Sequence, residues 1–198
     1  MKKRMQGLFF SLIAFFSVSS YGETLLIGDS LMGTISESYK KINNSESINI
    51  HFIVGSGLEN KKYDWFNYVK NTNLSKFDKI IISFGTNDFG ISNESLYAKK
   101  VKYFIKLIKD KNKNVEIIWV WSPVVKNQNI NAGINKVRHI IYKITKEDDI
   151  KFTDVRKSIG YDFVQYNKNE KIRTNDGIHY TLLAGDLIVK QINLTAQE

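Results

Sequence analysis

The chain of 198 residues contains no cysteine and a single proline, Pro123. Without cysteine it can form no disulfide, no thiolate nucleophile and no cysteine-ligated zinc site. Several catalytic and nucleotide motifs are also missing: there is no Gly-x-x-x-x-Gly-Lys, no dinucleotide-binding glycine fingerprint, no His-Glu-x-x-His and no Gly-x-Ser-x-Gly elbow. These absences argue against thiol, nucleotide and metal chemistry, and we expect no cofactor.

The first residues have the pattern of a secretory signal peptide. Basic residues at positions 2–4 precede a short apolar core at positions 8–16, and small residues then stand where a signal peptidase cleaves. The apolar core is too short for a permanent membrane span, although a retained anchor is the alternative. We therefore predict a signal peptide over residues 1–22, one domain over residues 23–198, no stable membrane anchor after cleavage, and a periplasmic or secreted location.

Basic residues outnumber acidic ones, 29 to 20, which gives a formal net charge of +9. Because three of the basic residues and none of the acidic ones lie in residues 1–22, residues 23–198 carry a net charge of +6. Most lysines are scattered among asparagines on predicted solvated helix faces. This pattern is typical of a soluble surface, and we predict no nucleic-acid partner.

Apolar strand-like runs alternate with helical patterns along the chain, which indicates a parallel sheet covered on both faces. Predicted strands cover residues 24–27, 47–54, 79–84, 115–121 and 151–154, and predicted helices cover 31–42, 63–70, 94–111, 129–146 and 181–192. The alternation favours an α/β fold, a three-layer α/β/α flavodoxin-like sandwich with a five-stranded parallel sheet. The aperiodic stretch 160–173 is a candidate flap over a site.

Polar residues directly after strands are expected to meet at the carboxyl edge of such a sheet, where ligands bind. Ser30 follows the first strand and opens a helix, where free backbone amides support negative charge. In Asp176-Gly-Ile-His179 the spacing lets the carboxylate hold the Nδ1 proton of the imidazole, which leaves Nε2 to take a proton from Ser30. The other two histidines, His51 and His139, fall within a predicted strand and a predicted helix, where structural roles are expected.

Two further segments, Ser56-Gly57 and Gly85-Thr86-Asn87-Asp88, also follow predicted strands. The backbone amide of Gly57 and the side-chain NH2 of Asn87 can join the Ser30 amide in an oxyanion hole. Taken alone, each segment is equally typical of a turn or a helix cap. The prediction of a site therefore depends on the segments occurring together.

Taken in order, these segments resemble the signature blocks of the SGNH, or GDSL, hydrolase family. The matching residues are Gly28-Asp29-Ser30 for block I, Gly57 for block II, Gly85-x-Asn87-Asp88 for block III and Asp176-x-x-His179 for block V. The resemblance covers essentially all of residues 23–198 and implies an SGNH hydrolase domain. It also implies catalytic roles for Ser30, His179 and Asp176, and oxyanion-hole roles for Ser30, Gly57 and Asn87.

A finer similarity lies after block II. Ser56-Gly57-Leu58 followed by Asp64-Trp65 is similar to a subgroup of exported bacterial SGNH proteins, although the proline usual after Trp65 is missing. Asp64 and Trp65 are candidates for the wall of the pocket. For Trp65, we favour the alternative of a buried aromatic anchor of the helix.

The leading hypothesis is a serine esterase that cleaves small acyl esters, above all O-acetyl groups, from an envelope or extracellular glycan. Its partner would then be an acylated small molecule or a glycan. The same chemistry leaves an O-acetyltransferase, a lipase or a thioesterase open. A different class of function is a non-catalytic domain that binds glycan or assists envelope assembly, because a preserved motif establishes competence and not use.

Overall fold

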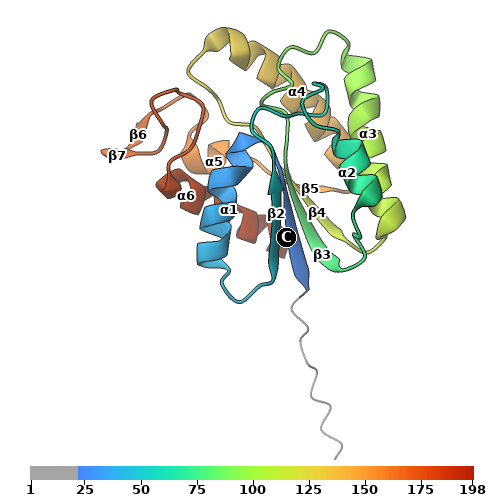
Figure 1. Cartoon of the computed structure of the whole chain (residues 1–198). Coiled ribbons are helices and arrows are strands. Elements are labelled where there is room, and N and C mark those ends of the chain that lie inside the picture. The colour runs from blue at the N-terminus through green and yellow to red at the C-terminus, as the bar shows by residue number, and fades with distance from the viewer. Residues whose placement is uncertain (1–21) are drawn as a thin grey trace, which may run out of the picture.

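A computed structural model describes residues 22–198 and shows a central sheet between two layers of helices (Figure 1). The signal peptide predicted for residues 1–22 therefore lies outside the described residues, apart from Gly22. Five parallel strands form the sheet in the order β2-β1-β3-β4-β5. This is the predicted three-layer α/β/α architecture with a five-stranded parallel sheet.

The strands of the sheet are β1 (Glu23–Gly28), β2 (Ile48–Phe52), β3 (Phe77–Ser83), β4 (Glu116–Val120) and β5 (Lys151–Thr153). The helices are α1 (Ser30–Ile42), α2 (Trp65–Asn71), α3 (Glu94–Lys111), α4 (Gln128–Glu147), α5 (Arg156–Ile159) and α6 (Leu182–Gln197). Two short strands, β6 (Tyr166–Asn167) and β7 (Glu170–Lys171), form an antiparallel hairpin.

The predicted strands and helices agree with the structure to within two residues except at one helix end, and two further elements were not predicted. The closing helix α6 continues to Gln197, well past the predicted end at residue 192. The helix α5 and the β6–β7 hairpin were not predicted, because four residues and two-residue strands are too short to show a periodic pattern. The hairpin occupies the candidate flap and extends outward beside α5 and α6 (Figure 1).

The core has two halves, one on each face of the sheet. In the central strand β3, Ile80 and Ile82 pack against the layer of α2, α3 and α4, whereas Ile81 packs against the layer of α1 and α6. All three side chains are fully buried, and burying each one contributes about 1.5–3 kcal/mol. Burial on both faces explains why β3 is apolar throughout this stretch and does not alternate.

Because all five strands are parallel, their carboxyl ends lie at one edge of the sheet. Ser30 begins α1 directly after β1, the loops that follow β2 and β3 carry Gly57 and Asn87, and the loop before α6 carries His179. Within residues 22–198, no helix is both long and apolar enough to span a bilayer.

Candidate active site

Ser30 lies where β1 ends and α1 begins. The side chain of Asp29 caps the helix by accepting the Leu31 amide at 2.9 Å, and the Asp29 amide donates to the Ser83 carbonyl at 3.0 Å. At Gly28 a Cβ would lie 2.6 Å from that carbonyl oxygen, so only glycine fits between the two strands. The turn therefore fixes Ser30 as the first residue of the helix, partly exposed, where backbone amides have no partner within the helix.

A chain of two hydrogen bonds joins Ser30 to the loop before α6. The Nε2 atom of His179 lies 2.8 Å from Ser30 Oγ, although the residues are 149 positions apart in sequence. On the other side of the ring, His179 Nδ1 lies 2.8 Å from Asp176 Oδ2. With the proton on Nδ1, the carboxylate accepts from the imidazole and Nε2 accepts from the serine hydroxyl.

The carboxylate of Asp176 is fixed by its own loop. Its Oδ1 atom accepts from the Thr174 hydroxyl at 2.7 Å and from the amides of Ile178 and His179 at 2.7 and 3.0 Å. Burial opposes ionisation, but the hydrogen bonds from the His179 ring, Thr174 and the two amides outweigh it and hold the pKa of Asp176 well below its ordinary value. Asp176 is therefore ionised and faces the imidazole in a defined orientation.

Arg173 joins the backbone just before His179 to the loop between β4 and α4, a role that was not predicted from the sequence. Its side chain is only 2 % exposed, and its guanidinium donates to the carbonyls of Ile178, at 2.9 Å, and Val124. The guanidinium also lies 5.0 Å from the ring centre of Tyr180. Burial lowers the pKa of Arg173, although its ordinary value is high enough for it to stay charged. The only sequence feature that pointed to this role is the position of Arg173 just before block V.

The side-chain amide of Asn87 links the segments that follow three different strands. Its Nδ2 donates to the Ser56 carbonyl at 2.9 Å and to Asp29 Oδ2 at 3.3 Å. Both N–H groups thus have partners in the protein. Donation to an oxyanion therefore requires Asn87 to give up one of them, and the longer bond to Asp29 is the weaker.

Asp88, the neighbour of Asn87, fixes the loop that contains Gly57. Its buried carboxylate accepts from the amides of Leu58 and Glu59 at 3.1 and 3.0 Å and from the Tyr97 hydroxyl at 2.8 Å. Burial raises the pKa of Asp88 in spite of these bonds. A Cβ on residue 57 would lie 2.1 Å from the Asp88 carboxylate, so the loop can approach it this closely only with glycine.

Asp29 is completely buried under Ser30. Burial raises its pKa from 3.8 to about 7; the Leu31 amide opposes the shift and the charge of Asp88 adds to it. The site therefore contains one carboxyl group, Asp176, that is firmly ionised and another, Asp29, that changes charge near neutral pH.

All the predicted site residues meet at this edge of the sheet. His51 and His139 do not take part: His51 Nε2 lies 2.8 Å from the Tyr63 hydroxyl, and His139 lies on α4. Trp65 is 1 % exposed and donates from Nε1 to Ser56 Oγ at 3.0 Å, so it is a buried anchor beneath the Gly57 loop. Asp64 is exposed and lines a hollow that begins at Gly57.

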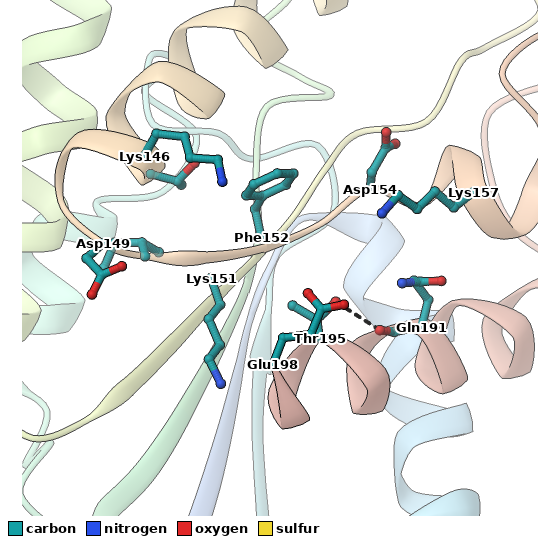
Figure 2. A pocket seen from close by; sticks show the side chains of 11 residues that line it. Lys146, Asp149, Lys151, Phe152, Asp154, Lys157, Gln191, Thr195 and Glu198 are labelled. Carbon is teal, nitrogen blue, oxygen red and sulfur yellow. Dashed lines mark hydrogen bonds between the residues drawn. The ribbon is translucent and has the colours of Figure 1, made fainter.

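Another hollow, of about 300 Å3, lies along the free edge of β5, between residues of α4 and α6 (Figure 2). Several of its polar groups are engaged: Asp154 accepts two bonds from the Arg156 guanidinium at 2.8 Å, Lys151 pairs with Glu116 at 2.8 Å, and the Thr195 hydroxyl donates to the backbone of its own helix. It contains no histidine, so it holds no nucleophile paired with an imidazole.

Solved structures share this fold over most of their length. A lipase/acylhydrolase from Enterococcus faecalis has a TM-score of 0.69 at 14 % identity, with 89 % of this chain and 96 % of the other covered. A GDSL-like lipase from Bacteroides thetaiotaomicron has a TM-score of 0.63 at 16 % identity, with 91 % and 90 % covered. A phospholipase A1 from Streptomyces albidoflavus has a TM-score of 0.64 at 14 % identity, with 89 % and 100 % covered.

These similarities show that the chain has the fold of the GDSL-type, or SGNH, hydrolases. Comparison with curated proteins gave no match. The chain belongs to the family described as protein of unknown function (DUF459), whose model matches residues 23–194.

Proposed function

We propose that the protein is an SGNH-type serine esterase that hydrolyses small acyl esters, with O-acetyl groups on an envelope or extracellular glycan as its substrates. The observation that carries the proposal is the hydrogen-bonded chain from Asp176 through His179 to Ser30. A serine hydroxyl is a weak nucleophile until a base is placed to remove its proton. Here one hydrogen bond of 2.8 Å joins the carboxylate to the base, and another of 2.8 Å joins the base to the nucleophile.

The geometry supports a two-step acyl transfer. Ser30 Oγ attacks the carbonyl carbon of the ester while its proton passes to His179 Nε2, and Asp176 stabilises the resulting imidazolium. The negative charge on the carbonyl oxygen is then held by the amides of Ser30 and Gly57 and by Asn87. When the tetrahedral intermediate collapses, His179 returns the proton to the leaving alcohol.

Water completes the cycle. His179 takes a proton from a water molecule, which attacks the acyl carbon bound to Ser30 Oγ. Collapse of this second intermediate breaks the bond to the serine, releases the carboxylic acid and returns the proton to Ser30 Oγ. The cycle needs no metal or redox group, since every proton is transferred through one imidazole.

The test is hydrolysis of p-nitrophenyl acetate by the purified protein and by Ser30→Ala. The variant should lose activity by a factor on the order of 10^4 or more and should no longer be labelled by a fluorophosphonate. Ser95→Ala, which changes an exposed serine on α3, is the matched control and should behave like the wild type. Equal hydrolysis and equal labelling of the wild type and Ser30→Ala would refute the assignment.

A further inference from the structure

Two adjoining hollows lead from the oxyanion-hole residue Gly57 along α2. The first, of about 330 Å3, begins at Gly57 and reaches Tyr63 and Asp64. The second, of about 300 Å3, shares Tyr63 and Asp64 with the first and continues along the helix to Thr72. Together they form a surface groove, which we call the α2 groove. It begins at Gly57, the one candidate site residue that lines it, and runs along the surface of α2.

The α2 groove is lined by amide, hydroxyl and carboxyl groups between aromatic rings. Asn67 and Asn71 project from successive turns of α2, and both are exposed. The Nδ2 atom of Asn67 and the Oδ2 atom of Asp64 make no hydrogen bond within the described residues, because only the Oδ1 atom of each is engaged. These atoms are available to a ligand.

The aromatic side chains of the groove are held in place from behind. The ring of His51 stacks on Tyr68, with centroids 4.3 Å apart and planes inclined by 4°, and His51 Nε2 lies 2.8 Å from the Tyr63 hydroxyl. Trp65 packs against both tyrosines and donates to Ser56 Oγ beside Gly57. Rigid aromatic rings lose little conformational entropy when they bind, and they offer flat surfaces to a ligand.

We propose that the α2 groove binds the sugar units of the glycan chain next to the one that carries the ester. Flat aromatic rings next to amides and a carboxylate suit sugar rings, which have an apolar face and a rim of hydroxyl groups. Leu58 and Phe66 make the first hollow partly apolar, but the amide, hydroxyl and carboxyl groups of the second suit a sugar better than an acyl chain. A polyanion would need a basic lining, whereas one lysine, Lys61, and one carboxylate, Asp64, line this groove. The link to Ser30 rests on the esterase function proposed above, but binding to the groove does not require turnover.

Binding can be tested with the inactive Ser30→Ala protein, labelled with 15N, by NMR titration. The probes are acetylated xylo-oligosaccharides, acetylated chito-oligosaccharides and O-acetylated peptidoglycan strands, each in short and long forms. The expected result is that at least one series shifts the side-chain amide signals of Asn67 and Asn71, with tighter binding by the longer chains. The double substitution Asn67→Ala with Asn71→Ala, made in the Ser30→Ala protein, should weaken that binding about tenfold. This factor corresponds to the loss of one or two ordinary hydrogen bonds.

Asn135→Ala provides the matched control, because Asn135 is an exposed helical asparagine on α4, outside the groove. It should leave both the affinity and the chain-length dependence unchanged. If none of the three series shifts Asn67 or Asn71, or if the double variant binds as tightly as the control, the proposal is wrong. Failure of the esterase function would appear separately, as a wild type that neither hydrolyses p-nitrophenyl acetate nor reacts with a fluorophosphonate while still binding glycan.

Discussion

Replacement of Asp29 by asparagine should make the stability of the protein less dependent on pH. Asparagine has the same shape as aspartate and is an equally good N-cap, so its Oδ1 can still accept the Leu31 amide. The substitution removes the ionisable group whose pKa burial raises to about 7. It leaves the fold of the strand-to-helix turn at Ser30 in place.

The sign and size of the effect follow from the two pKa values of Asp29. Between the unfolded value of 3.8 and the folded value of about 7, the folded protein keeps a proton that the unfolded chain has lost. The wild type therefore loses stability as the pH rises through this window, by up to about 1.4 kcal/mol per pH unit and about 4 kcal/mol in all. About 3 kcal/mol of this loss falls between pH 5 and pH 8.

The assay is urea unfolding of both proteins at pH 5 and pH 8, followed by the fluorescence of the buried tryptophans Trp65, Trp119 and Trp121. The free energy of unfolding of Asp29→Asn should gain about 3 kcal/mol relative to the wild type between these pH values. In the variant, two amide groups face each other at Asn87, but this cost does not depend on pH and cancels in the difference. Parallel pH dependences of the two proteins would refute a raised pKa at Asp29.

Two further substitutions test how the site is held together. Gly57→Ala places a methyl group against the Asp88 carboxylate and should lower kcat for p-nitrophenyl acetate about 100- to 1000-fold, as expected for the loss of an oxyanion donor; wild-type kcat would show that the Gly57 amide is not used. Arg173→Ala should lower kcat about 10- to 100-fold with little change in KM, because the carbonyls of Ile178 and Val124 lose a charged partner. Millimolar guanidinium should restore part of that activity, and an unchanged kcat would show that Arg173 does not position His179.

The layers of the fold could be predicted from the sequence because the strands are short apolar runs and the long helices have one apolar face. Helix α3 was predicted with its observed bounds, since Val101, Ile105 and Ile108 repeat at helical spacing and are all buried. The end of α6 was placed too early because it depends on a tertiary contact: Thr195 is buried and accepts the hydroxyl of Thr153 on β5. A local pattern cannot show a partner 42 positions away.

For the candidate site, the sequence predicts which residues lie at the ends of strands and helices, but not how they are held. Ser30, Gly57, Asn87 and His179 each follow or precede a recognisable element, so parallel topology alone brings them to one edge. Asp176 was predicted to orient His179, but the positioning roles of Asp29 and Arg173 were not: Asp29 was recognised only as part of block I, and Arg173 looks like an ordinary charged residue in the sequence. Their roles depend on burial, which only the folded structure reveals.

Polar groups that are buried or partly buried join the loops of the candidate site. Asn87 joins the segments after β1 and β2, and Asp88 fixes the Gly57 loop. Burying the carboxyl groups of Asp29 and Asp88 costs free energy, which is why burial raises the pKa of both. A protein selected for stability alone would place apolar side chains there. The structure therefore gives up stability at this edge in return for fixed backbone donors, and Asp29→Asn should return part of it above pH 7.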